Sequence, residues 1–203
     1  MIYLVRHGDT AATARRVFEG AGSGADLGSG LTAEGVRQAD VVARALERRG
    51  VTRAYTSPLL RTTQTAQIVC SRLGVEPIVF PDLREGSFGL WEGLTFDEIQ
   101  SGYPEHVKQW FADPVDFSPP GGESVRQMAD RAWKCLLSIV TDSTERRGSA
   151  VVVTHGGPIR AIIATCLFGG LDAFGAIPQS PGAMNILRYE ADSLVVEVVN
   201  VRA

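Results

Sequence analysis

The chain has 203 residues, 44% of them hydrophobic and 21% charged, which are ordinary values for a globular protein and exclude a largely disordered chain. The formal net charge of −3 gives no overall attraction for nucleic acid or anionic membranes, so any anion site must be local. The three cysteines lack metal-binding spacing, and neither a signal segment nor a transmembrane span follows Met1. We therefore expect a cytoplasmic protein with one domain over residues 1–203.

Two apolar runs, one near each end of the chain, end in a histidine followed by glycine. Residues 2–5 run into Arg6 and His7, and residues 150–154 run into His155. Both runs are typical of buried strands. A single histidine is more often a hydrogen-bonded structural residue, but the repeated context favours a ligand site. In α/β sheets, ligands bind where parallel strands end.

The chain between these two strands begins with a glycine-rich stretch. We interpret residues 9–30 as a flexible surface loop and not a nucleotide cradle, because no GK[ST] motif follows. Thr32 then caps a helix, and a short strand over residues 54–56 leads into Ser57, the predicted N-cap of the next helix. Arg61 falls in the first turn of that helix. There it either faces an anion or is a solvated surface charge.

The second half of the chain completes an α/β pattern with one insertion. Glycines, prolines and aromatic residues between about 86 and 124 predict a small cap of short helices. The expected fold is a three-layer α/β/α sandwich with a mostly parallel central sheet, an antiparallel edge and this helical cap. The remaining predicted elements are a strand over 78–80, a helix over 123–144, a helix over 158–167, and paired strands over 184–189 and 194–200.

The strand ends together offer two arginines, Arg6 and Arg61, and two imidazoles, His7 and His155. Phosphate is their natural ligand, because arginine forks match phosphate oxygens and a neutral histidine can attack phosphorus. The nearby guanidinium charges disfavour an imidazolium, so we expect His7 to be neutral and reactive. Glu85, in the segment after the strand over residues 78–80, supplies an acid.

Leu4-Val5-Arg6-His7-Gly8-Asp9-Thr10 resembles the signature of the histidine phosphatase superfamily, which includes the cofactor-dependent phosphoglycerate mutases. An arginine-histidine-glycine triplet alone is a weak signal, but the resemblance covers nearly the whole chain in a consistent order. The other matching stretches are residues 31–39, 57–66, 83–93, 121–124 and 154–157.

The resemblance implies a role for each member of the set. His7 would become phosphohistidine, while Arg6, Arg61 and His155 would bind the transferring phosphoryl group. Glu85 would protonate the leaving alkoxide and then activate water. No metal or other cofactor is implied.

The resemblance also implies that Thr13 and Gly156 contact the substrate. At Thr13, and at Glu19 nearby in the sequence, the chain departs from the family pattern. The family often has asparagine where Thr13 stands and glutamine where Glu19 stands. Thr13 still offers a hydroxyl group, whereas Glu19 would repel an anion unless it is protonated or turned away.

The resulting hypothesis is a metal-independent phosphomonoesterase for a small phosphorylated metabolite, similar to α-ribazole phosphatases or broad-specificity phosphatases. A phosphoglycerate mutase-type phosphotransferase and a catalytically silent phospholigand-binding protein are the alternatives. The expected partner is a small phosphomonoester, without nucleic acid or membrane, and a homodimer is left open.

The charge of the cap favours hydrolysis of an ester whose alcohol is neutral or aromatic. Lys108 is the only lysine or arginine between Gly86 and Ser124, against seven acidic residues, and a mutase must hold a second anion. Arg15 and Arg16 would weaken this argument if the loop after the first motif moved their side chains into the site.

Overall fold

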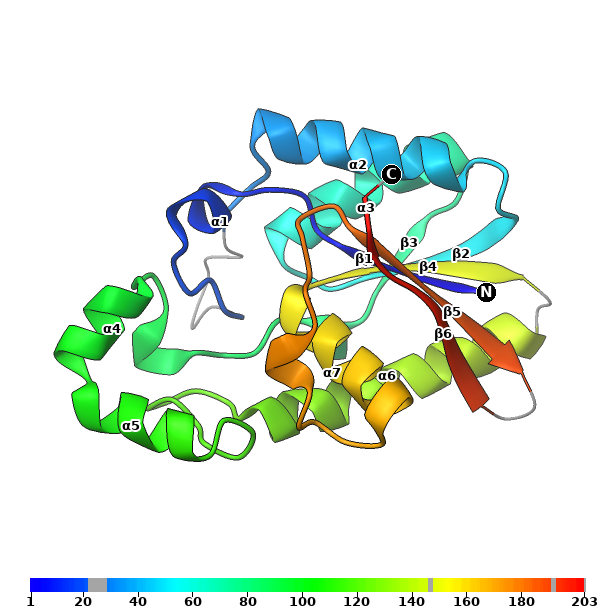
Figure 1. Cartoon of the computed structure of the whole chain (residues 1–203). Coiled ribbons are helices and arrows are strands. Elements are labelled where there is room, and N and C mark those ends of the chain that lie inside the picture. The colour runs from blue at the N-terminus through cyan, green and yellow to red at the C-terminus, as the bar shows by residue number, and fades with distance from the viewer. Residues whose placement is uncertain (22–28, 146–147, 191–192, 203) are drawn as a thin grey trace.

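The computed structural model describes residues 1–21, 29–145, 148–190 and 193–202. Strands and helices alternate through most of this chain, as expected of an α/β protein (Figure 1). The strands are β1 (Ile2–Arg6), β2 (Val51–Thr56), β3 (Pro77–Val79), β4 (Ser149–Thr154), β5 (Met184–Glu190) and β6 (Ser193–Val201). The α-helices are α1 (Ala11–Arg15), α2 (Ala33–Leu46), α3 (Leu60–Leu73), α4 (Phe96–Gly102), α5 (Pro104–Ala112), α6 (Val125–Glu145) and α7 (Gly156–Phe168). The short 3₁₀ helices are η1 (Pro81–Leu83), η2 (Gly89–Trp91) and η3 (Phe174–Ala176).

The six strands form one sheet in the order β3-β2-β4-β1-β5-β6. β3, β2, β4 and β1 are parallel to one another, β5 is antiparallel to β1, and β6 is antiparallel to β5. In the β1–β4 pair, Arg6 lies opposite Thr154, and the amide of His7 donates to the carbonyl of Thr154 at 3.0 Å. This register places His7 and His155 side by side at one edge of the sheet.

Helices cover both faces of the sheet, which confirms the predicted three-layer sandwich with an antiparallel edge. Helices α2 and α3 pack on one face, and α6 and α7 on the other (Figure 1). The central strand β4 meets both layers, and its residues 150–153 have no exposed surface. This explains its unbroken apolar run, since a strand covered on both faces has no solvent side.

The cap lies beyond the carboxyl ends of the parallel strands and contains the short helices η2, α4 and α5 (Figure 1). It has its own small core, in which Trp91, Ile99 and Val107 are buried. Phe18, from the segment that follows α1, packs into this core and stacks edge to face on Phe88. The cap is thereby attached to the segment that follows the first strand.

The interpretation of residues 9–30 as a flexible surface loop is wrong for its first part. Residues 11–15 form α1, whose N-cap Thr10 is fully buried and accepts a hydrogen bond from the amide of Thr13. Residues 22–28 lie outside the described part of the chain. The glycines that follow in the sequence hide this five-residue helix, because so short a helix has almost no periodicity.

Candidate active site

His7 follows β1 and is only 3% exposed. Its Nδ1 lies 2.8 Å from the carbonyl oxygen of Gly8. Because a carbonyl oxygen only accepts, Nδ1 must carry the proton, and Nε2 of the neutral ring has a free lone pair. Burial, followed by the charges of Arg6 and Arg61, holds the pKa of His7 well below its usual value. His7 therefore has the tautomer and protonation state of a nucleophile.

His155 follows β4 and is fully buried, with its ring centroid 5.2 Å from that of His7. Its Nε2 lies 2.7 Å from Ser57 Oγ, which lies 2.6 Å from Thr62 Oγ1. Each hydroxyl can donate or accept, so Thr62 can donate to Ser57, and Ser57 to Nε2 of the neutral ring. The ring proton then lies on Nδ1, which can donate it to an anion. Burial, with Arg61 the next largest cause, also holds the pKa of His155 well below its usual value.

Ser57 has a different role from the predicted one. Helix α3 begins at Leu60, its N-cap is Leu59, and no side chain caps it. The Ser57 hydroxyl is bound to His155 and Thr62 instead. The sequence signal for this role was available, because Ser57 follows β2 just as His155 follows the neighbouring β4.

Three buried nitrogens of the site lack a hydrogen-bond partner within the described chain: Arg6 Nε, Arg61 Nη1 and His155 Nδ1. Only one other buried side-chain polar atom of the described residues, Trp91 Nε1, shares this state. Arg61 is 1% exposed and is fixed by donating from Nη2 to the carbonyls of Glu19 and Gly20, at 3.2 and 3.1 Å. Buried polar groups normally have partners, so this cluster is suited to an anion with several oxygens.

Glu85 lies beside these groups, on the segment that follows η1. Its Oε1 accepts from the amide of Gly86 at 3.0 Å and its Oε2 from the amide of Gly157 at 3.2 Å. Its charge acts on both Arg6 and Arg61. Glu85 is thus held at the same sheet edge by the first turn of α7.

The structure brings the predicted catalytic residues together at one edge of the sheet. A comparison with known protein families shows to which family the chain belongs. The sequence profile of the histidine phosphatase superfamily (branch 1) matches residues 2–202. The chain belongs to this superfamily. The resemblance drawn from the ordered motifs is therefore confirmed, and so is the fold class.

Relatives of this chain carry both phosphatase and mutase names. A probable phosphoglycerate mutase of Serratia proteamaculans is 35% identical over 173 residues, which are 85% of this chain and 76% of the relative. A bifunctional protein of Mycobacterium tuberculosis is 31% identical over 94% of this chain, which spans only 50% of that relative's length. The structure of a mycobacterial glucosyl-3-phosphoglycerate phosphatase in complex with VO3 is 27% identical, with a TM-score of 0.85 and 98% of each chain covered. These relatives support a phosphoryl-transfer enzyme.

The two departures from the superfamily pattern lie on the same side of the site. Thr13 Oγ1 lies 3.0 Å from Thr10 Oγ1, and Thr10 Oγ1 donates to Glu19 Oε2, also at 3.0 Å. Glu19 Oε1 lies 3.4 Å from Arg61 Nη1. The Glu19 carboxylate is therefore turned toward the site and not away from it.

A cavity of about 910 Å³ opens from the site toward the cap. Arg6, Glu85, Gly156 and Gly157 are among its lining residues, and the role of Gly156 as a substrate contact stays a prediction. Two more cations line it, Arg126 and Arg160, which the charge count over residues 86–124 missed because both lie outside that range. The cap side is aromatic and includes Phe18, Phe88, Trp91, Trp110, Phe111 and Phe117.

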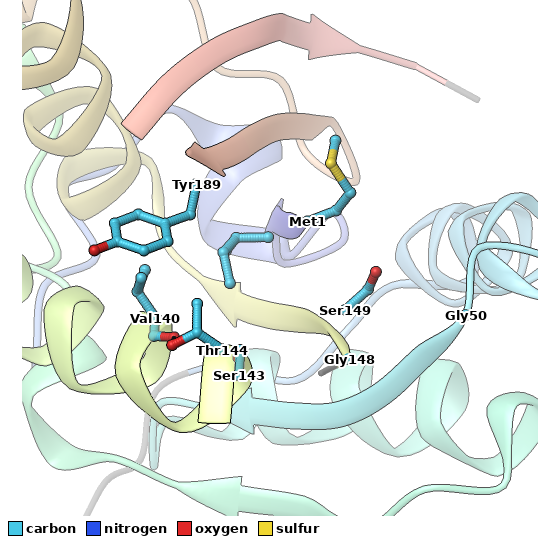
Figure 2. A pocket seen from close by; sticks show the side chains of 9 residues that line it. Met1, Gly50, Val140, Ser143, Thr144, Gly148, Ser149 and Tyr189 are labelled. Atoms are coloured by element: carbon cyan, nitrogen blue, oxygen red, sulfur yellow. Dashed lines mark hydrogen bonds between the residues drawn. The ribbon is translucent and has the colours of Figure 1, made fainter. Parts of the chain in front are cut away.

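A second cavity, of about 370 Å³, lies at the opposite end of the sheet (Figure 2). Met1, Val140, Ser149 and Tyr189 are among its lining residues, and the lining contains no histidine, carboxylate, arginine or lysine side chain within the described chain. The described residues also contain no group of three or more histidine, cysteine, aspartate or glutamate side chains placed to hold a metal ion. No helix of the described ranges is long and apolar enough to cross a membrane.

Proposed function

We propose that this protein is a metal-independent phosphomonoesterase that hydrolyses a small phosphorylated metabolite through a phosphohistidine on Nε2 of His7. The observation that carries the proposal is the set of unpaired buried nitrogens on Arg6, Arg61 and His155 around a neutral histidine with a free lone pair. Together they match what a phosphoryl group presents, which is several negative oxygens around an electrophilic phosphorus.

In the first half of the reaction, the phosphoryl oxygens bind the two guanidinium groups and His155. Nε2 of His7 attacks phosphorus while the bond from phosphorus to the ester oxygen breaks. Glu85 in its acid form gives its proton to the departing oxygen, so the alcohol leaves neutral. The arginines neutralise the charge on the equatorial oxygens, which is the main requirement of phosphoryl transfer.

In the second half, the Glu85 carboxylate takes a proton from water as the water oxygen attacks phosphorus. The bond from phosphorus to Nε2 breaks, inorganic phosphate leaves, and His7 returns to its neutral form with Nδ1–H still bound to the Gly8 carbonyl. Glu85 ends in the acid form in which it began, so the cycle is balanced in atoms and protons.

Phosphohistidine trapping tests this proposal directly. We expect rapid quench with radiolabelled substrate, in buffer containing EDTA, to give acid-labile and base-stable phosphate on the wild-type protein. His7→Ala should trap none, whereas His106→Ala, which removes the stacked histidine of the cap, should trap as much as the wild type.

Two results would reject the proposal. One is full phosphatase activity in His7→Ala across a panel of phosphomonoesters. The other is activity that disappears with EDTA and returns with a divalent ion.

A further inference from the structure

The carboxylate of Glu19 lies beside the proposed phosphoryl site and is fixed there. Oε1 accepts from the amide of Ser29 at 2.6 Å and lies 3.4 Å from Arg61 Nη1. Oε2 accepts from the hydroxyl of Thr10, a fully buried residue, at 3.0 Å. The Glu19 side chain is 16% exposed. A carboxylate held from three directions is not free to turn out of the site.

Arg61 Nη1 is also one of the three buried nitrogens that can receive a phosphoryl oxygen. An oxygen bound to Nη1 at an ordinary hydrogen-bond distance would lie at most roughly 6 Å from Glu19 Oε1. Two further carboxylates act on the same guanidinium: Glu85, and Glu92, which abuts Gly20. A fully ionised phosphoryl group would therefore meet like charge at short range in a buried site.

A phosphoryl group that keeps one proton avoids this repulsion, because its O–H can donate to a carboxylate that only accepts. We propose that Glu19 is a specificity-determining residue that makes the site select the phosphomonoester monoanion, whose P–O–H donates to the Glu19 carboxylate. The inference rests on the proposed function, since the ligand is the same phosphoryl group. It adds that Glu19 discriminates between the monoanion and the fully ionised form of that group.

The two histidines of the site are compatible with catalysis at acidic pH. A phosphate monoester takes up its second proton near pH 6, so the monoanion predominates below that value. Burial and the arginines lower the pKa of both His7 and His155, so both resist protonation as the pH falls. The nucleophile is thus protected from protonation where the selected form of the substrate is abundant.

Inorganic phosphate and sulfate are suitable probes, because the two ions have the same shape but only phosphate keeps a proton at mildly acidic pH. At about pH 5.5, we expect calorimetry to show that the wild type binds phosphate on the order of 10- to 100-fold more tightly than sulfate. Glu19→Gln, which keeps the shape and removes the charge, should bring the two dissociation constants within about threefold, mainly by tighter sulfate binding. Glu105→Gln, at an exposed residue of the cap, is the matched control and should behave like the wild type.

Binding measurements on the wild type alone can contradict the proposal, so the test does not depend on whether a variant folds. Equal affinity for sulfate and phosphate, or a phosphate-to-sulfate ratio unchanged in a folded Glu19→Gln protein, would overturn it. Between about pH 5.5 and 7.5, phosphate affinity should fall while sulfate affinity stays flat. Absence of turnover with every ester would reject the proposed function without altering this binding ratio.

Discussion

The lowered pKa of His7 depends in part on the same two arginines that bind the phosphoryl group in the proposed reaction. Burial is the largest cause of its lowered pKa, and Arg6 and Arg61 are the next. When a phosphoryl anion binds these arginines, it offsets their charge and makes a cationic ring less costly. In the proposed reaction, the ring is thus neutral before attack, and the phosphohistidine would be stabilised once the anion is in place.

Glu85 can be tested by a change that keeps its shape. Glu85→Gln retains an oxygen that can accept from Gly86 or Gly157 but has no acidic proton to give. We expect kcat for an alkyl phosphate to fall on the order of 10²- to 10⁴-fold. The loss should be much smaller for p-nitrophenyl phosphate, whose alcohol leaves without protonation.

Glu92 is the comparison residue for this prediction. Its Oε1 accepts from the amide of Phe88 at 3.1 Å, so it supports the local backbone. Glu92→Gln keeps an oxygen that can accept from Phe88, so it should affect both esters equally and by less than about tenfold. Equal losses for the two esters in Glu85→Gln would contradict the role of Glu85 as the acid.

At the level of elements, the sequence was enough to predict the features that depend on a single strand or on two neighbouring strands. The apolar runs of β1 and β4 and the rule that ligands bind at strand ends were enough to bring His7 and His155 together. The orientation of Glu19 was not predictable, because it depends on Thr10, Ser29 and Arg61, which are close only after the chain has folded. The start of α3 was misplaced for a related reason, since Ser57 binds a histidine 98 residues away instead of capping its own helix.

The first turn of α7 positions Glu85, and Gly157 tests this. A Cβ at this position would lie 2.2 Å from Glu85 Oε1 and 2.7 Å from Met128 Sδ. Gly157→Ala should displace the carboxylate by about 1 Å and lower kcat on the order of 10²-fold. Alanine favours the helix by up to about 1 kcal/mol, which offsets part of the crowding, so Tm should change little.

Gly102→Ala is the matched control, because Gly102 is also helical and a Cβ there would meet no heavy atom within 4 Å. It should leave both kcat and Tm near the wild-type values. If Gly157→Ala keeps full activity, or if its kcat falls only in step with unfolding, then α7 does not position Glu85.

At the scale of the whole molecule, the large cavity, where we expect the alcohol part of the substrate to lie, is built from distant parts of the chain. Phe18 comes from the segment after α1, Trp110 from the cap, and Arg160 from α7, and all three line the large cavity. The sheet edge supplies polar lining residues of this cavity, and the cap supplies aromatic ones. The amino-acid composition of residues 86–124 therefore describes only one wall of the cavity.

The charges of this cavity bear on the choice between hydrolysis and mutase activity. Arg15 and Arg16, the exceptions raised by the sequence, do not line it. Arg126 does, but it is paired with Asp116, with a second contact of 2.8 Å. Among the described lining residues, this leaves Arg160 as the cation available to a second anionic group, since Arg6 belongs to the phosphoryl site.

We expect hydrolysis to dominate and neutral or aromatic phosphomonoesters to exceed 3-phosphoglycerate in kcat/KM by about tenfold or more, because Asp113 and Asp172 oppose Arg160 in the same cavity. Arg160→Gln should lower kcat/KM for 3-phosphoglycerate and leave an aryl phosphate within about threefold, whereas Arg126→Gln should distinguish the two substrates less. The measurement is steady-state release of phosphate alongside the rate of isomerised phosphoglycerate. If isomerised product forms faster than free phosphate, and Arg160→Gln abolishes that advantage, then Arg160 alone is enough to hold the second anion and the mutase assignment replaces the phosphatase.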